Sequence, residues 1–242
     1  MDNGIYVTLS RQMALFRDMD ITSNNIANAN TTAFNSEHIL FNTLLKQDIS
    51  QGTPNKVAFA DNIRSYRNHE EGALVVTGND LDLAIKGEGY FTVETPAGIR
   101  YTRAGKFERD ATGQMVTSDG HPLLDVSGKP ILLPDNATSI TIGSAGNLKV
   151  NGEDFAIIGV VQFDNPQLLE RLDNKLFRSE VPGQPAQDFT VTQGTLENSN
   201  VKPVVELTNM ISISRSVADT AKFVEVMYDL QRKTSNTWAQ QQ

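Results

Sequence analysis

Residues 204–238 read VVELTNMISISRSVADTAKFVEVMYDLQRKTSNTW and contain neither glycine nor proline. Apolar residues return within this stretch at alternating spacings of three and four, the a/d pattern of a coiled-coil helix. Pro203, directly before it, suits the first turn of a helix. A continuous helix on the order of 50 Å long is therefore expected. The a/d seam consists of Leu207, Met210, Ser214, Val217, Ala221, Val224 and Tyr228, with Ser214 as its one polar member.

The N-terminal end predicts a second helix with a narrow apolar stripe. The stripe resumes at Ile26, and the asparagine-rich NNIANANTT (24–32) then favours the end of the helix. We expect the N-terminal helix within 1–33, the C-terminal helix within 196–242, and an antiparallel or crossing coiled coil between them. The stripe is formed by Ile5, Leu9, Met13 and Phe16, at spacings of four, four and three.

The middle of the chain has a different period. From 72 to 195 apolar residues alternate with a period of two, and the turn signals TPAG, DATG, DG and NG recur between them. Within this region AIIGVVQF (156–163) has the composition of one strand. Residues 34–71 show no sustained period and predict an extended or loop linker, with QDISQGTPNK (47–56) as an exposed loop. The fold class is thus α+β, with a central all-β domain, an irregular sandwich or barrel, between two helices.

Composition narrows the possible partners. The 242 residues carry 21 Lys and Arg against 29 Asp and Glu, a net charge of −8, and no cysteine. Nucleic acids and anionic membranes attract clustered cations, so neither is an expected partner. The lack of cysteine excludes disulfides and thiolate metal sites. The opening MDNGIYVTLSRQMALFRDMD lacks the pattern of a secretory signal peptide, so we expect a cytoplasmic protein or one exported without a cleaved signal.

Motifs for catalysis are weak. Asp80 and Asp82 have the D-x-D spacing of a calcium loop, but apolar residues follow where oxygen ligands are needed, so a turn is favoured. Gly87 and Gly89 form G-x-G before a strand instead of a helix, which also favours a tight turn. We therefore predict no catalytic residue, cofactor, metal or small-molecule substrate, and a protein that is not an enzyme.

Two features point to assembly instead. Ordering the terminal helices costs about 1–2 kcal/mol per residue, so an isolated pair is expected to be marginal until neighbouring copies cover its outer faces. Asn24, Asn25 and Asn28 cannot lie unpaired in an apolar core, because a buried unpaired amide costs a few kcal/mol. Inter-subunit or loop hydrogen bonds and local capping of the helix end are equally compatible with these asparagines.

Four blocks of sequence resemble the bacterial flagellar rod and hook proteins. They run in order through nearly the whole chain: NNIANANTTAF (24–34), TGNDLDLAIKGEGYF (77–91), YTRAGKFERDATGQMVTSDGHPLL (101–124) and QGTLENSNVKPVVELTNMI (193–211). The short length, the opening MDNGIYVTLS and GKPILLP (128–134) favour a proximal-rod member over the longer distal-rod proteins.

The resemblance implies a structural subunit of the basal-body rod. It implies other rod subunits and copies of itself as partners in a helical array, export by the flagellar type III apparatus, and a periplasmic location. Glycine commonly stands before the aromatic residue of the first block in that family, since it adopts positive φ without steric cost. Here the residue is Ala33, and the sequence leaves open whether the turn keeps its conformation.

The expected assembly interface follows from the two helical seams and the asparagines. The alternatives are another axial component, such as a distal-rod or hook protein, and a secreted β-rich module that binds calcium or glycan. The interface is predicted to comprise Leu9, Met13, Phe16, Asn24, Asn25, Ile26, Asn28, Leu207, Met210, Val217, Ala221, Val224 and Tyr228.

Overall fold

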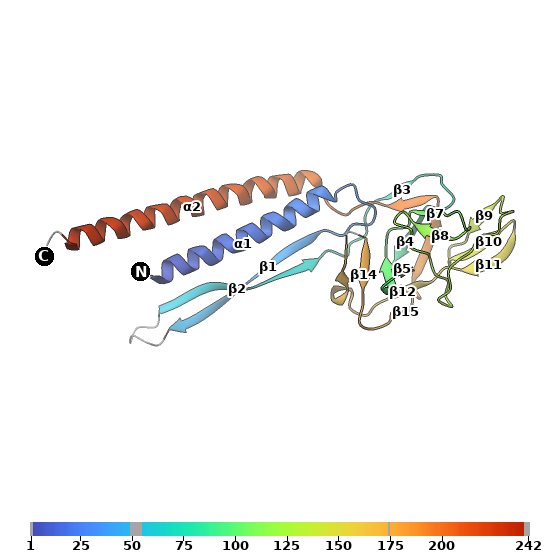
Figure 1. The fold of residues 1–242 in the computed structure, drawn as a ribbon, viewed down its shortest axis with the longest axis horizontal. Coiled ribbons are helices and arrows are strands. Elements are labelled where there is room, and N and C mark those ends of the chain that lie inside the picture. The colour runs from blue at the N-terminus through green and yellow to red at the C-terminus, as the bar shows by residue number, and fades with distance from the viewer. Residues whose placement is uncertain (1, 49–54, 174, 240–242) are drawn as a thin grey trace. The chain divides into compact units, whose positions relative to one another are not determined.

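The computed structural model describes the backbone of residues 2–48, 55–173 and 175–239, and the side chains of 7–40, 64–173, 175–230, 232 and 233. The chain forms two compact units that interleave along the sequence (Figure 1). The helical unit comprises Met1–Ala27, Glu37–Arg67 and Lys202–Gln242. The β unit comprises Asn28–Ser36 and Asn68–Val201, somewhat more of the chain than the predicted domain of 72–195.

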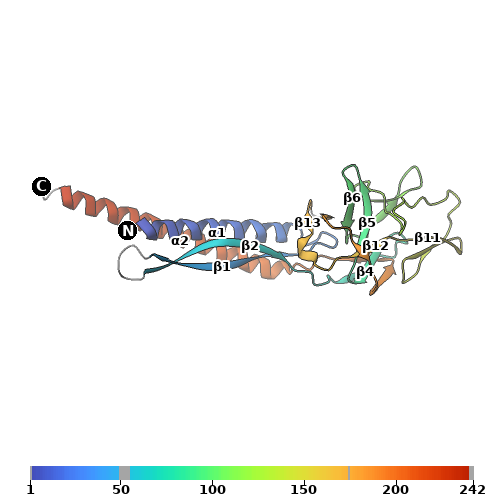
Figure 2. The same cartoon turned by 90° about the horizontal axis from the view of Figure 1, so that it is seen from below.

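The helical unit confirms both predicted helices. Helix α1 spans Asp2–Ala27 and helix α2 spans Pro203–Ala239, and both are continuous. The two helices run antiparallel, and α1 also packs against the strands β1 (Glu37–Asp48) and β2 (Asn55–Arg67) (Figures 1 and 2). Helix α1 therefore lies between α2 and the hairpin.

The hairpin replaces the linker that we expected at 34–71. Strands β1 and β2 pair antiparallel from Glu37 opposite Arg67 to Asp48 opposite Asn55, with one irregularity between Phe41 and Thr43. The sequence prediction is wrong here because it relied on alternation. Pairing between strands satisfies the backbone hydrogen bonds whether or not apolar residues alternate. Of the predicted loop 47–56, residues 49–54 lie outside the described residues.

The β unit is built from short strands, as its period of two and its frequent turns predict. A 3₁₀-helix η1 (Pro166–Leu168) interrupts them. The strands are β3 (Leu74–Val76), β4 (Leu83–Gly87), β5 (Tyr90–Thr95), β6 (Gly98–Thr102), β7 (Phe107–Arg109), β8 (Met115–Thr117), β9 (Ile140–Ile142), β10 (Asn147–Val150), β11 (Glu153–Ile157), β12 (Val160–Gln162), β13 (Glu170–Arg171), β14 (Leu176–Arg178), β15 (Gln184–Pro185), β16 (Phe189–Gln193) and β17 (Thr195–Glu197).

These strands form several small antiparallel sheets. The largest has the order β13-β14-β6-β5-β12-β15, and a three-stranded sheet has the order β11-β10-β9. The remaining pairs are β16-β4, β17-β3 and β7-β8. Within the described residues no sheet closes on itself, so the β unit is not a simple barrel. The run 156–163, expected as one strand, divides into β11 and β12 at Gly159, where a Cβ would lie 2.8 Å from the carbonyl oxygen of Asp125.

The core of the β unit is apolar and closely packed. Leu83, Phe91 and Phe107 are completely buried, and the two phenylalanine rings meet edge to face with their centroids 5.3 Å apart. A second cluster contains Tyr90, Tyr101, Leu169 and Phe177. Burial of each large side chain in this core stabilises the unit by about 1.5–3 kcal/mol.

A buried ion pair ties the ends of the β unit together. The Arg103 Nε donates to Glu197 Oε2 at 2.9 Å, and both side chains are less than a tenth exposed. The guanidinium also donates to the carbonyl oxygens of Ile85 and Gly89, and Glu197 Oε1 accepts from the Gly72 backbone N–H. A buried pair needs such additional hydrogen bonds to offset the cost of removing two charges from water.

The turn before Phe34 keeps a left-handed backbone. Ala33 has φ of 55°, although it carries a Cβ, and its N–H donates to the Glu197 carbonyl oxygen at 2.8 Å. Phe34 behind it is 1% exposed, and the Arg171 guanidinium lies over its ring at 4.5 Å from the centroid. These contacts hold Ala33 in a conformation that costs an alanine roughly 1–2 kcal/mol.

Candidate assembly interface

The inner face of α2 is a heptad seam, but its polar members outnumber its fully buried apolar ones. Glu206, Ile213 and Thr220 are buried at spacings of seven, and half-buried residues lie between them. We call this set the inner seam. It consists of Glu206, Met210, Ile213, Val217, Thr220, Val224 and Met227, at alternating spacings of four and three.

The inner seam overlaps the predicted seam at every second position. Met210, Val217 and Val224 are half-buried, as an a/d assignment requires. The other predicted members, Leu207, Ser214, Ala221 and Tyr228, lie one residue too late and are exposed. The assignment of Ala221 to an inward-facing a/d seam is therefore wrong within the subunit. The prediction assigned only apolar residues to the inward-facing positions. Glu206 and Thr220 are polar but buried, so the true seam lies one residue earlier at every second position.

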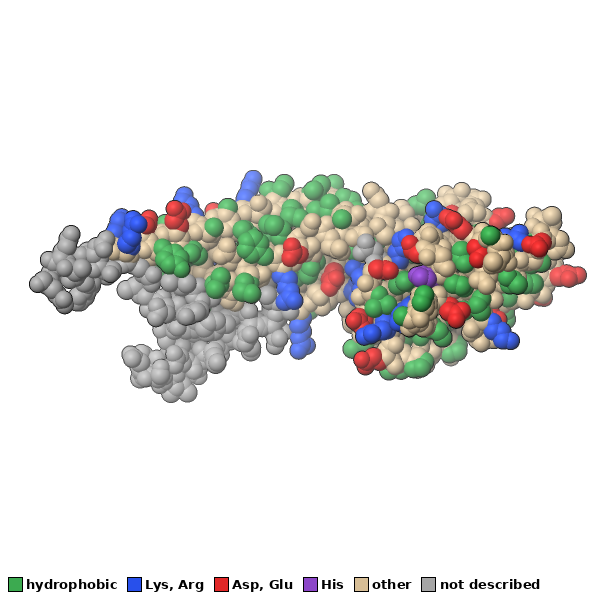
Figure 3. Space-filling model, in the orientation of Figure 1, with side chains coloured by type: hydrophobic (Ala, Val, Ile, Leu, Met, Phe, Trp, Pro, Cys, Tyr) green, Lys and Arg blue, Asp and Glu red, His purple; other side chains and the backbone are tan. Residues whose placement is uncertain are grey.

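The apolar stripe of α1 also faces outward. Leu9, Met13 and Phe16 are 51%, 64% and 47% exposed. The buried side chains of α1 are instead the small or polar Ala14, Thr22 and Asn25. Among the described side chains of the helical unit, Ala14 and Ile213 are the only buried apolar ones. Figure 3 shows hydrophobic side chains gathered on the visible surface of the helices.

Asn25 joins three elements of the helical unit through one side chain. Its Oδ1 accepts from the Glu37 N–H at 3.0 Å, and its Nδ2 donates to the Glu37 carbonyl oxygen at 2.8 Å and to Glu206 Oε2 at 3.3 Å. The amide is 1% exposed. It therefore links α1 to β1 and α2 inside the subunit, with partners that the sequence did not indicate.

The other N-terminal residues of the predicted interface differ in burial. Asn28 belongs to the β unit, is buried, and accepts from the Thr31 hydroxyl at 3.1 Å, a local turn contact. Asn24 is exposed and Ile26 is half-buried. The three asparagines therefore differ in their roles. Asn25 links three elements, Asn28 makes a local turn contact, and Asn24 lies at the surface.

A polar pocket opens where α1, α2 and β1 meet. It has a volume of about 340 Å³ and is lined by Asp18, Glu37, His38, Glu206 and by Thr22, Ile39, Asn209, Ser212 and Ile213. Burial raises the pKa of the Asp18 carboxyl above its ordinary value, the Glu206 carboxylate raises it further, and His38 opposes the rise. Sequence pattern alone could not find this pocket, because the residues that line it are far apart along the chain.

The motifs considered for ligand binding serve as turns. The carboxylate of Asp82 accepts from the Thr77 hydroxyl at 2.6 Å and from the Asn79 amide at 3.1 Å, so it holds its own loop. Gly87 has φ of 94° and ends β4, which agrees with the tight turn predicted for G-x-G. No group of three or more His, Asp or Glu suited to a metal ion occurs in the described part of the chain.

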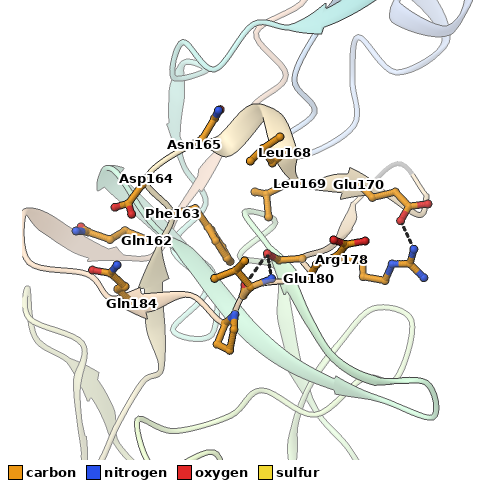
Figure 4. A pocket seen from close by; sticks show the side chains of 13 residues that line it. Gln162, Phe163, Asp164, Asn165, Leu168, Leu169, Glu170, Arg178, Glu180 and Gln184 are labelled. Carbon is orange, nitrogen blue, oxygen red and sulfur yellow. Dashed lines mark hydrogen bonds and ion pairs between the residues drawn. The ribbon is translucent and has the colours of Figure 1, made fainter.

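A second cavity, of about 450 Å³, lies in the β unit beside η1 (Figure 4). Phe163, Leu168 and Leu169 contribute apolar surface to it. Several polar groups of this cavity bond to other residues of its lining. Arg178 pairs with Glu170 at 2.5 Å, and the Ser179 hydroxyl donates to the Val181 carbonyl oxygen at 2.6 Å. Among the described helices none is long and apolar enough to cross a membrane.

Comparison with known proteins agrees with this architecture. Residues 5–34 match the family described as flagella basal body rod protein. Residues 84–150 match the flagellar hook protein FlgE/F/G D1 domain, and residues 192–237 match the flagellar basal body rod FlgEFG protein C-terminal family. The three matches cover α1, much of the β unit, and α2.

Individual relatives extend the similarity over the whole chain. The flagellar basal-body rod protein FlgF of Caulobacter vibrioides is 38% identical over 241 residues, which cover 96% of each chain. FlgF of Mesorhizobium japonicum is 36% identical and covers 91% of each chain. The flagellar basal-body rod protein FlgG of Bacillus subtilis is 30% identical over 98% of this chain and 99% of the relative.

The three family matches, with two terminal helices and a β unit between them, place the chain among the axial structural proteins of the bacterial flagellum. Identities of 36–38% over nine-tenths or more of the chain then place it within that class. The chain belongs to the flagellar basal-body rod protein family and is of the FlgF type. It is a structural subunit and not an enzyme.

Proposed function

We propose that this chain builds the proximal rod by packing its terminal helices against those of neighbouring subunits, in a coiled-coil layer. The observation that carries the proposal is the poor core of the helical unit. Its described side chains bury only Ala14 and Ile213 among the apolar ones, while Leu9, Met13 and Leu207 are half exposed or more. Marginal helices gain order when neighbouring copies cover such faces.

The interface is narrower than the one predicted from sequence. Leu9, Met13 and Phe16 on α1 and Leu207, Ala221 and Tyr228 on α2 are exposed and available to a neighbour. Asn25 and the inner-seam members Met210, Val217 and Val224 instead hold the two helices and the hairpin together within one subunit. Their part in assembly is to present the outer faces in a fixed geometry.

Copies that meet through different faces form an open helical array. A heterologous contact, in which one face of a subunit meets a different face of the next, repeats without closing unless the rotation returns to the start. The exposed stripes of α1 and α2 are different in sequence and so suit a heterologous contact. Other rod subunits and copies of this chain are its partners in this proposal.

The route to the rod is proposed from the resemblance to the family and from the composition. The chain has no cysteine, so no disulfide has to be reduced before an unfolded chain passes through an export channel. We propose export by the flagellar type III apparatus without a cleaved signal peptide, followed by folding of the helices on docking in the periplasm.

Substitution of Met13 tests the proposed interface. Met13→Glu places a charge at a position that is 64% exposed in the free subunit, so the free chain keeps its thermal midpoint. In the rod the same charge is desolvated, and incorporation into basal bodies and motility are expected to be lost. Arg17→Gln changes the net charge equally, lies beside the stripe and is exposed, so it serves as the control. Normal incorporation of Met13→Glu would contradict the proposal.

A further inference from the structure

The surface of helix α2 can be divided into three lengthwise faces, the inner seam and one flank on either side of it. Only the inner seam is packed within the subunit along the described helix. With about 100° per residue, the positions directly after and directly before the inner seam form two flanks. Flank A consists of Val204, Leu207, Ile211, Ser214, Ala218, Ala221, Glu225 and Tyr228, all exposed. Flank B consists of Val205, Asn209, Ser212, Ser216, Asp219, Phe223, Val226 and Leu230.

A polar ridge separates the two flanks on the side opposite the inner seam. It consists of Thr208, Arg215, Lys222 and Asp229, spaced seven residues apart and exposed throughout. A helix that met one broad apolar surface would not carry such a ridge along its middle. The pattern indicates two separate helix-sized contacts beside the intramolecular one.

The flanks differ in their surroundings. Asn209 and Ser212 of flank B line the polar pocket together with Glu37 and His38, so the first half of flank B faces the hairpin side of the unit. Flank A is exposed over its whole length. Its first part is bulky, with Val204, Leu207 and Ile211, and its middle is made of the small Ser214, Ala218 and Ala221. Small side chains in the middle let a neighbouring helix with large side chains approach closely.

We propose that flank A receives the α1 stripe Leu9, Met13 and Phe16 of a second copy of this chain. The inference rests on the proposed function, and names the partner face within it. Both faces follow alternating spacings of four and three, so they can interlock as knobs into holes. The stripe supplies the large side chains that the small middle of flank A lacks.

Charge complements this fit. Asp20 continues the α1 stripe by one heptad step, and it is exposed. Arg215 and Lys222, on the ridge that borders the small middle of flank A, are exposed too. None of these three forms an ion pair with any residue in the described ranges. A carboxylate that reaches one of these two cations in a partly desolvated contact favours this pairing over like-charged alternatives.

Cysteine cross-linking tests the pairing, because the natural chain contains no cysteine. Two differently tagged copies are expressed together, one with Met13→Cys and the other with Ile211→Cys, Ser214→Cys, Ala218→Cys or Ala221→Cys. Basal bodies are isolated and oxidised. At least one flank A position is expected to give the mixed-tag dimer in several-fold higher yield than Thr208→Cys on the ridge or Val226→Cys on flank B.

Incorporation of both tags, measured on the same samples, separates this inference from the proposed function. Both tags in the rod with higher yield from flank B or the ridge, or with no mixed dimer from any flank A position, would overturn the pairing and leave the rod function standing. Absence of the unsubstituted tagged chain from isolated basal bodies would count against the proposed rod function itself.

A charge exchange gives a second measurement that needs no cross-link. Asp20→Lys is expected to reduce incorporation several-fold by placing a cation near Arg215 or Lys222, whichever of the two lies at that end of the contact. Combining it with Arg215→Asp and Lys222→Asp is expected to restore incorporation, because the charges are opposite again. Failure of the combined variant to recover, in a chain that keeps its thermal midpoint, would contradict the pairing.

Discussion

The helical unit and the β unit differ in how much of their apolar side-chain surface they bury. Phe91, Phe107 and Leu83 of the β unit are completely buried, whereas no large apolar side chain of the helical unit reaches that state among those described. The charges differ as well. The helical unit carries eleven Lys and Arg against ten Asp and Glu, and the β unit carries ten against nineteen. The β unit therefore carries a net charge of −9 and the helical unit +1, so electrostatic repulsion between copies arises mainly from the β unit.

The difference indicates a division between folding and assembly. Near-neutral helices can approach one another in an array without strong repulsion. Their exposed stripes then provide the apolar area that their own subunit does not bury. Variants that act on one unit only can separate these two roles.

Truncation of Phe91 tests the contribution of the buried core to the stability of the β unit. Phe91→Ala removes a completely buried ring that meets Phe107 edge to face. We expect a loss of about 3–5 kcal/mol in the free energy of unfolding of the β unit. Denaturant titration followed by circular dichroism measures it. The exposed Phe155→Ala, in the same unit, is the control and is expected to change stability little.

Removal of the buried ion pair tests the same unit through its polar contacts. Glu197→Gln removes the nearer carboxylate partner of the Arg103 guanidinium, at 2.9 Å, and leaves the more exposed Glu71 at 3.5 Å. We expect a loss of about 1.5–3 kcal/mol in the free energy of unfolding, because a buried charged hydrogen bond is lost while one carboxylate remains. Neutralising the exposed Glu108 should leave the denaturant midpoint unchanged, since its contact with Lys106 is at the surface. Equal midpoints for both variants would show that the pair contributes nothing.

The pH dependence of the helical unit follows from Asp18. Its pKa is raised by burial and by Glu206, so the folded state binds this proton more tightly than the unfolded state does. The contribution of Asp18 to stability is therefore greatest below its ordinary pKa of 3.8 and is lost as the pH rises through the raised value. Asp18→Asn is expected to remove that part of the dependence. Thermal melts of the helical signal between pH 4 and pH 7 would contradict this if both chains gave the same slope.

Substitution of Ala33 is expected to give the smallest change in stability. Its φ of 55° suits glycine better than alanine, although glycine also increases the entropy of the unfolded chain. Ala33→Gly is expected to stabilise the β unit by about 0.5–1 kcal/mol. Thermal unfolding gives the sign of the effect directly. Ala104→Gly, at a residue without positive φ, should destabilise instead, and a loss of stability in both variants would argue against strain at Ala33.

Local pattern predicted much of this molecule from its sequence. Both helices, the period-two region and the glycine turns follow from spacing and turn chemistry within a few residues. The hairpin of β1 and β2 was missed because its pairing joins residues up to thirty positions apart, such as Glu37 and Arg67, and neither strand alternates strictly. The resemblance to rod proteins supplied the function, which periodicity alone did not.

The inner seam shows why the site was only half predicted. A heptad search finds apolar residues and assigns them inward, and it gave Met210, Val217 and Val224 correctly. It could not assign Glu206 inward, because the reason lies in Asn25, 181 residues away, whose amide reaches the Glu206 carboxylate. The apolar residues left over, such as Leu207 and Tyr228, are exposed in the subunit for that same reason.

Hydrogen exchange of the free chain and of the chain in isolated basal bodies tests the central claim most directly. The account predicts strong protection of the β unit in both states. It predicts that backbone amides of α1 and α2 are protected in the rod but exchange rapidly in the dilute free chain. Equal protection of the two helices in the free chain and in the rod would contradict the claim that neighbouring subunits complete the burial of the helical unit.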